Sequence, residues 1–188
     1  MELCSVSLDQ CFVPEGGTQL FNHSMPANEK FLFQLASGLE FIHSKGYVHG
    51  SIKPSNILLV SFNTDPQVKL SDFGLTRESH TISSFNDGVD WNLQHLVFWL
   101  APELLGSLLQ HSSKHVSTLH CTKDGDIFAA GCVFFYFLSQ GFHLFGDDAK
   151  IDILPNIMQG NQVNLLRMTL NSFICEFILM FNYNYQES

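Results

Sequence analysis

His49-Gly50-Ser51-Ile52-Lys53-Pro54-Ser55-Asn56 is the stretch that decides the fold of this chain, together with Asp72-Phe73-Gly74 a short distance further on. Ile57–Val60 follows the first motif and Val68–Leu70 precedes the second, and both runs favour strands. A turn-rich linker separates the two runs, which predicts a pair of short strands. Pairing would place Asn56 and Asp72 on one face of a cleft. Amide and carboxylate oxygens are the ligands that Mg²⁺ prefers, so a magnesium site is predicted there.

These two motifs resemble the catalytic loop and the metal-binding loop of eukaryotic protein kinases, which are H-R-D-L-K-x-x-N and D-F-G. The resemblance implies that Asn56 and Asp72 hold magnesium ions and that Lys53 lies beside the γ-phosphate of ATP. Two positions depart from the family pattern, because Gly50 replaces its arginine and Ser51 replaces its catalytic aspartate. The chain therefore retains the motifs of a kinase but lacks the catalytic aspartate.

Ser51 determines how much catalysis we expect. The family's aspartate accepts the proton of the substrate hydroxyl, whereas a serine hydroxyl is neutral at about pH 7 and a far weaker acceptor. A general base contributes about 10²- to 10⁴-fold to the rate of an enzyme. We therefore expect a pseudokinase that binds ATP (or ADP) and Mg²⁺ but is weak or inactive in phosphotransfer.

Further motifs follow in the order and spacing of the family, namely Ala101-Pro102-Glu103 and then Asp126 with Gly131. A lone D-F-G arises often by chance, but a whole series in one order does not. The resemblance implies that Asp126 hydrogen-bonds the backbone of the catalytic loop. A helix N-terminal carboxylate stabilised by the helix dipole is an equally plausible interpretation of the pattern.

Hydrophobic periodicity predicts a helix from Asn28, as its cap, to Lys45, with Gly46 as the stop. Its apolar stripe has the spacing of a core-facing helix and consists of Phe31, Leu35, Leu39 and Ile42. Ile127–Leu138 is apolar all round, which is typical of a helix buried in a core. Between them, residues 106–122 are rich in Ser and His and are predicted to form a loop insertion.

The start of the chain resembles the hinge of the kinase fold, which implies that Glu2 and Cys4 contact the adenine of a bound nucleotide. Neither a G-x-G-x-x-G loop nor a V-A-I-K strand precedes it. We therefore expect an α+β, protein-kinase-like fold, made of the mainly helical large lobe (residues 1–166) with the small lobe absent. Residues 167–188 depart from the pattern and are predicted to be a divergent tail.

One branch of the kinases is more similar than the rest. Asp126–Tyr136 (DIFAAGCVFFY) and Ser139–Gly146 (SQGFHLFG) resemble the inositol-requiring kinase/endoribonucleases of the unfolded protein response. The kinase-like domain of ribonuclease L, which binds nucleotide without needing to phosphorylate, is a relative. The resemblance implies a kinase on the cytosolic face of the endoplasmic reticulum membrane, homodimerisation through that domain in the full-length parent, and an endoribonuclease domain that this chain lacks.

Composition excludes several classes of function. A net charge of −9 with only nine Lys and Arg argues against direct nucleic-acid binding. The longest apolar runs are too short to cross a bilayer, so we expect no membrane span in this chain and a cytoplasmic location. The five cysteines lack paired spacing and are predicted to be free thiols.

Three functional hypotheses remain open at this point. The leading one is a pseudokinase fragment of an unfolded-protein-response sensor that binds nucleotide. A working serine/threonine kinase is the second, because Lys53, Asn56 and Asp72 are retained and positioning supplies much of the catalysis. The third is a non-functional truncated fragment with an exposed lobe interface.

Overall fold

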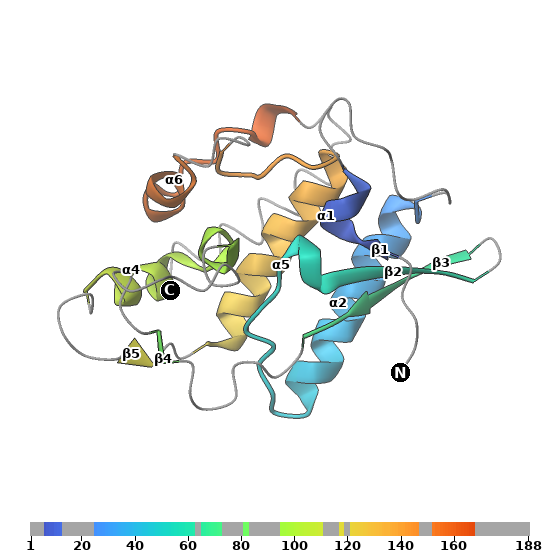
Figure 1. The fold of residues 1–188 in the computed structure, drawn as a ribbon, viewed down its shortest axis with the longest axis horizontal. Helices are drawn as coiled ribbons and strands as arrows, with labels where there is room; N and C mark the ends of the chain where they lie inside the picture. The colour runs from blue at the N-terminus through green and yellow to red at the C-terminus, as the bar shows by residue number, and fades with distance from the viewer. Residues whose placement is uncertain are drawn as a thin grey trace.

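The computed structural model describes residues 6–12, 25–62, 65–72, 81–82, 95–110, 117–118, 121–146 and 152–167. These residues are mostly helical and include one three-stranded sheet, as the predicted α+β class requires (Figure 1). The predicted hinge residues Glu2 and Cys4 and the predicted tail from residue 168 onward lie outside these ranges. The elements are β1 (Val6–Ser7), α1 (Leu8–Cys11), α2 (Asn28–Ser44), η1 (Pro54–Asn56), β2 (Ile57–Phe62), β3 (Asp65–Leu70), β4 (Thr81–Ile82), η2 (Val97–Trp99), α4 (Pro102–Gln110), β5 (Ser117–Thr118), α5 (Lys123–Leu138), α6 (Ile153–Gln159) and η3 (Leu165–Arg167).

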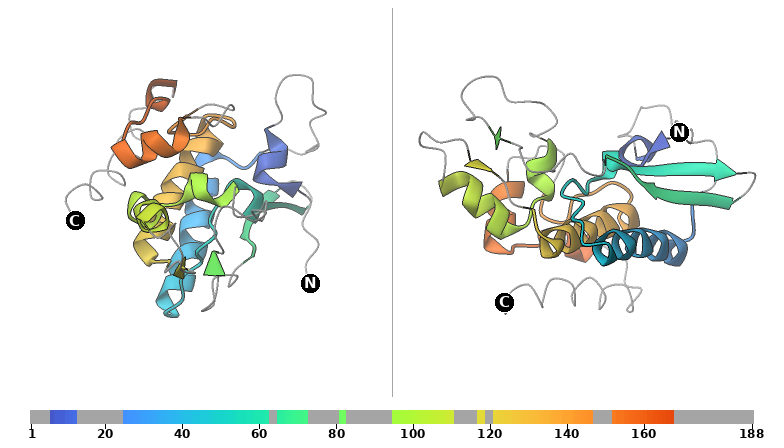
Figure 2. Two further views of the ribbon diagram at one scale, coloured as in Figure 1. Left: turned by 60° about the vertical axis from the view of Figure 1, so that its left-hand side comes forward. Right: turned by 90° about the horizontal axis from the view of Figure 1, so that it is seen from below.

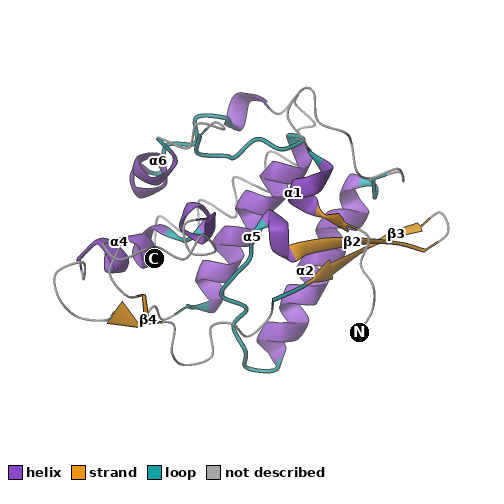
Figure 3. Cartoon of the chain, viewed as in Figure 1, coloured by secondary structure: helices purple, strands orange, loops and turns teal. Residues whose placement is uncertain are grey.

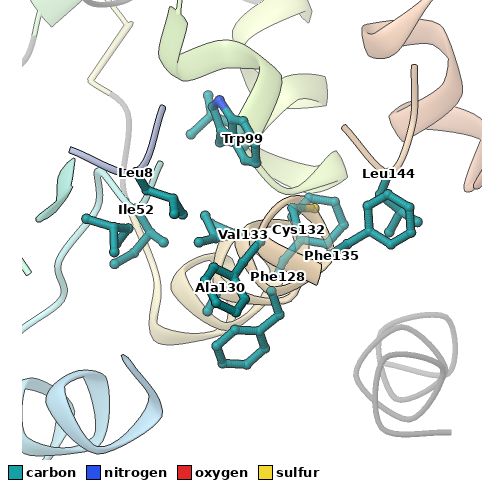
Figure 4. Close-up of a cluster of buried hydrophobic side chains, with 14 of the residues drawn as sticks. Leu8, Ile52, Trp99, Phe128, Ala130, Cys132, Val133, Phe135 and Leu144 are labelled. Carbon is teal, nitrogen blue, oxygen red and sulfur yellow. The ribbon is translucent and has the colours of Figure 1, made fainter. Parts of the chain in front are cut away.

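Helix α5 forms the centre of the structure, with α2 beside it and the sheet beyond α2 (Figures 1 and 2). The prediction that this segment is buried all round is confirmed, because nearly every residue from Gly125 to Phe137 is buried. Its side chains point outward in several directions to meet Leu8, Ile52, Trp99 and Leu144 (Figure 4). The side chain of Thr122 caps the helix by accepting a hydrogen bond from the Gly125 nitrogen at 3.0 Å.

Helix α2 covers one side of α5 and ends as predicted, with Gly46 in a left-handed conformation two residues after it (φ 78°). The buried members of its stripe are Phe31, Leu35 and Leu39. The Phe31 ring stacks on Phe137 of α5 with centroids 3.7 Å apart. The predicted cap was wrong: Asn28 is the first helical residue, and Ala27 occupies the cap position without a side-chain hydrogen bond.

The sheet has the order β1-β2-β3 and is antiparallel throughout (Figure 3). In the predicted pair, Ile57 of β2 is opposite Leu70 of β3. Helix α2 fixes β3, because Gln34 accepts a hydrogen bond from the Val68 nitrogen at 2.8 Å. Gly38 permits the close approach, since a Cβ there would lie 3.2 Å from Leu70 Cδ1. The chain is thus held firmly at the point where β3 leads into Asp72.

The predicted loop insertion was wrong over its first residues. Helix α4 begins at Pro102 and continues to Gln110, through Gly106. Leu104, Leu105 and Leu108 recur at helical spacing and are buried in the core, which stabilises the helix despite the polar residues between them. Within the predicted insertion, residues 111–116 and 119–120 lie outside the described ranges.

The turn after α5 contacts Phe98 and Trp99, which lie just before α4. His143 is buried, its Nε2 lies 2.9 Å from the Phe98 carbonyl, and its ring meets Trp99 edge-on at 4.6 Å. Asn164 donates from Nδ2 to the carbonyls of His143 and Gly146. These bonds hold the residues before α4 against the core.

Candidate functional site

Asp126 organises the backbone of the predicted catalytic loop. Its carboxylate, buried in the first turn of α5, accepts hydrogen bonds from the backbone nitrogens of His49 and Gly50, each at 2.7 Å. The predicted bond between Asp126 and the catalytic-loop backbone is therefore confirmed. A third contact comes from His43 Nε2 at 2.9 Å from Oδ2. Both carboxylate oxygens are thus engaged, and the loop is fixed to the central helix.

Gly50, at the position of the family's arginine, adopts a left-handed conformation with φ 72°. Glycine reaches this region without the Cβ clash that other residues meet. Its nitrogen points to Asp126, and its carbonyl faces the Cys121 sulfur at 3.7 Å. The substitution therefore suits the backbone turn between His49 and Ser51.

His49 lies fully buried behind this turn. Its Nδ1 accepts a hydrogen bond from the Ser51 nitrogen at 3.3 Å, and it also interacts with the backbone of Ser71. Burial lowers the pKa of His49 below its ordinary value of 6.5, although Asp126 opposes this shift. A neutral ring at neutral pH follows, and it serves to tie the catalytic loop to the segment before Asp72.

Ser51 takes the position of the catalytic aspartate, and only 5% of its surface is exposed. Its hydroxyl donates to the backbone carbonyl of Asp72 at 3.1 Å, and Oγ lies 3.2 Å from His49 Nδ1. A hydroxyl whose hydrogen is directed at a carbonyl is a weak candidate for a base. The side chain instead connects the two motifs that the sequence singled out.

Asn56 and Asp72 are brought together as predicted. Asn56, at the end of η1, donates from Nδ2 to the Ser51 carbonyl at 2.8 Å. Its own carbonyl accepts hydrogen bonds from both the nitrogen and the hydroxyl of Ser71, at 2.9 and 3.1 Å. Since β2 starts at Ile57 and β3 ends at Leu70, strand pairing brings the backbones of the two predicted ligands to the same end of the strand pair.

The oxygen donors at this site fit a hard divalent cation. The bond to the Ser51 carbonyl uses the Asn56 Nδ2 and not its Oδ1, and Asp72 is exposed. Asp72 has φ 56°, a left-handed conformation that is uncommon for residues other than glycine and commoner for aspartate than for most of them. Within the described ranges, no cluster of three or more His, Cys, Asp or Glu side chains could hold a metal. One carboxylate and one amide match Mg²⁺, which takes its remaining ligands from phosphates and water.

The structure describes Lys53 but only part of the remaining predicted site. Lys53 is half-buried, has an extended backbone and directly precedes η1, three residues before Asn56. Phe73 and Gly74 of the second motif lie outside the described residues, as do the predicted adenine contacts Glu2 and Cys4. No helix in the part of the chain that the structure describes is long and apolar enough to span a membrane.

His43 is a site residue that sequence reasoning missed. It lies in the last turn of α2, and its contact with Asp126 bridges 83 residues of sequence. Nearby, Lys123 donates to the His43 carbonyl at 2.8 Å. No local pattern around His43 signals these contacts, which arise only where α2 and α5 pack together.

Comparison with known proteins agrees with this geometry. Residues 2–179 match the family model of the protein kinase domain. The chain is 36% identical over 159 residues to the human serine/threonine-protein kinase/endoribonuclease IRE2, covering 78% of this chain and 15% of that protein. It is 34% identical over 145 residues to the sensor for unfolded proteins in the ER ire1 of Schizosaccharomyces pombe, covering 69% and 13%. It is 29% identical over 184 residues to the kinase/endoribonuclease ireA of Aspergillus fumigatus, covering 86% and 16%.

The matches confirm the predicted resemblance to kinase/endoribonucleases of the inositol-requiring type and the predicted fold class. The chain spans between 13% and 16% of the length of these three relatives. With the catalytic-loop frame, the paired strands and the central helix all in place, this chain belongs to the protein kinase domain family.

Proposed function

We propose that this chain is part of a kinase-like domain that binds a magnesium nucleotide, ATP or ADP, and is weak or inactive in phosphotransfer. The observation that carries the proposal is Ser51. It stands where the kinase motif has its base, it is buried, and its hydroxyl is directed at the Asp72 carbonyl. A site that has lost its base while keeping its cation ligands favours binding over turnover.

Three retained residues support nucleotide binding. Asn56 and Asp72 would supply amide and carboxylate oxygens to Mg²⁺, and Lys53 would lie beside the phosphates. Bound Mg²⁺ neutralises phosphate charge. The chain's own contribution is to hold these ligands: Ser71 ties the strand end to Asn56, and Asp126 fixes the loop that carries Ser51 and Lys53. Glu2 and Cys4 are proposed to contact the adenine.

Loss of the base bears on the rate rather than on binding. With serine in place of aspartate, the substrate hydroxyl lacks a strong proton acceptor, which lowers the rate by about 10²- to 10⁴-fold. Metal and phosphate positioning remain, and they supply much of the stabilisation in phosphoryl transfer. We therefore place this domain among the pseudokinases that use nucleotide as a structural ligand.

The relatives indicate a setting for this domain. Because the similar proteins include a sensor for unfolded proteins in the ER and kinase/endoribonucleases, we propose a role in the unfolded protein response. In a full-length parent the kinase would lie in the cytoplasm at the endoplasmic reticulum membrane and form a homodimer. Residues 1–166 are proposed as the large lobe, and residues 167–188 as a divergent tail. Nucleic-acid binding is not assigned to this chain.

The test compares nucleotide binding with phosphotransfer in the same preparation of the full chain. We expect calorimetry to detect ADP binding that strengthens with Mg²⁺, and a phosphotransfer assay to find no product above background. Asp72→Asn should remove the Mg²⁺ dependence, because it removes the charged cation ligand. Asp152→Asn, a change to another exposed carboxylate, serves as the matched control.

The outcomes separate the competing hypotheses. Robust turnover that Asp72→Asn abolishes would establish a working kinase and overturn the pseudokinase proposal. Absence of any nucleotide binding, together with broad, non-cooperative unfolding and dye binding, would favour a non-functional fragment instead. Binding without turnover supports the proposal.

A further inference from the structure

We propose that Ser51 is a positioning residue for the cation ligand Asp72, so that the substitution that removed the base also created a bond between the two loops. This inference rests on the proposed binding of a magnesium nucleotide. It assigns Ser51 an active role in that binding, instead of treating it only as the remnant of a lost catalytic group.

The direction of the hydrogen bond carries the argument. The Asp72 backbone carbonyl can only accept, so at 3.1 Å the Ser51 hydroxyl must donate to it. The Ser51 side chain is buried, and two acceptors lie within reach of its hydroxyl hydrogen, the Asp72 carbonyl at 3.1 Å and His49 Nδ1 at 3.2 Å. Ser51 is itself held in place, since its carbonyl accepts from Asn56 Nδ2 and its nitrogen donates to His49 Nδ1.

Asp72 requires such support because of its backbone. Its φ of 56° lies in the left-handed region, which residues other than glycine adopt infrequently, although aspartate and asparagine do so more often than most. A residue keeps this conformation when its surroundings hold it from more than one side. Ser71 is bound to the Asn56 carbonyl just before Asp72, and Ser51 binds the Asp72 carbonyl just after its Cα. Together these bonds hold the backbone on both sides of the Asp72 Cα.

An aspartate at position 51 would not make this bond. An ionised carboxylate only accepts hydrogen bonds, so it would face the Asp72 carbonyl as a second acceptor. Replacing aspartate by serine therefore substitutes a hydrogen-bond donor for an acceptor at the point where the two loops meet. For this chain it follows that Ser51→Asp does not simply restore a kinase: it removes a contact that the cation ligand uses.

The test measures ADP affinity of the full chain with Mg²⁺ and, separately, with the metal chelated. Ser51→Ala is expected to weaken the Mg²⁺-dependent affinity by about tenfold, the equivalent of one hydrogen bond, and to leave metal-free affinity unchanged. Ser51→Thr keeps the hydroxyl and should stay within about twofold of wild type by the same reasoning. Ser51→Asp should lose at least as much as Ser51→Ala. Ser55→Ala, a neighbouring serine in η1, is the matched control.

A further variant and a stability measurement serve as controls for effects of the substitutions on folding. Ser51→Cys retains shape with a weaker donor and should give an intermediate affinity, so the test still decides if Ser51→Ala does not fold. Equal Mg²⁺-dependent affinity in wild type and Ser51→Ala would overturn the inference alone. If Ser51→Ala lost metal-free and Mg²⁺-dependent affinity by the same factor, the inference would also be overturned. If wild type binds no nucleotide under either condition, the proposed function and the inference both fail.

Discussion

The carboxylate of Asp126 and the backbone nitrogen of Gly50, 76 residues apart in sequence, are joined by a hydrogen bond of 2.7 Å. With the parallel bond to the His49 nitrogen, this contact attaches the catalytic loop to the central helix α5. Stability and site geometry therefore depend on the same buried carboxylate.

Asp126→Asn is expected to destabilise the fold by about 3 kcal/mol, because an amide keeps one acceptor and turns a donor toward the backbone nitrogens of the loop. Chemical denaturation measures the free energy of unfolding. Asp124→Asn changes an exposed carboxylate in the same helical turn and should cost less than about 1 kcal/mol. Equal losses in the two variants would contradict the special role of Asp126.

Gly50→Ala and Gly106→Ala should change stability in opposite directions. At Gly50 the φ of 72° disfavours a side chain, and we expect a loss of about 1–2 kcal/mol. Gly106 lies inside α4, where an added Cβ would meet only Met158 Cε at 3.8 Å. Alanine there should stabilise by about 0.5–1 kcal/mol. Thermal unfolding of both variants checks this, and a destabilised Gly106→Ala would refute the comparison.

His49 should make stability fall as the pH is lowered. Burial holds its pKa in the folded protein below the ordinary value of 6.5, so the unfolded chain takes up the proton first. The contribution of the neutral ring is complete above 6.5 and is lost as the pH falls from there toward the folded pKa. The expected slope is at most about 1.4 kcal/mol per pH unit.

The measurement is denaturant unfolding of wild type and His49→Gln at a series of pH values. His49→Gln should remove this part of the slope, whereas His95→Gln, at an exposed histidine, should retain it. Carboxylates distant from His49 contribute equally to all three proteins and cancel in the difference, whereas Asp126 and Asp72, which act on His49, do not cancel fully. A pH dependence of His49→Gln that equals wild type would show that His49 does not titrate in this way.

Burial should also rank the reactivity of the described cysteines, Cys11, Cys121 and Cys132, which are free thiols as predicted. Cys132 in α5 is buried and its pKa is raised by desolvation, so alkylation should require unfolding. Cys121 is partly exposed, and burial followed by the charge of Asp126 raises its pKa to about 11. It should react slowly but in the native state. Peptide mapping after timed alkylation tests this order, and rapid native labelling of Cys132 would be inconsistent with it.

Much of the site could be predicted from local sequence. Paired strand patterns on either side of a turn-rich linker placed Asn56 and Asp72 together, and the register of Ile57 with Leu70 confirms the pairing. The apolar run in α5 indicated a buried helix for a similarly local reason. Errors came where local preference competed with packing: polar residues after Gly106 indicated a loop, but leucines at helical spacing extended α4 to Gln110.

The sequence by itself determined the order of the motifs, the replacement of aspartate by Ser51 and the retention of Asn56 and Asp72, because these are properties of the covalent chain. Only the tertiary structure decided what Ser51 and His43 contact. Ser51 meets the Asp72 carbonyl and His43 meets Asp126 because strand pairing and the packing of α2 near α5 bring distant segments within hydrogen-bonding distance. Hydrogen bonds between distant segments depend on the positions of both partners, and no local pattern around either residue specifies the other.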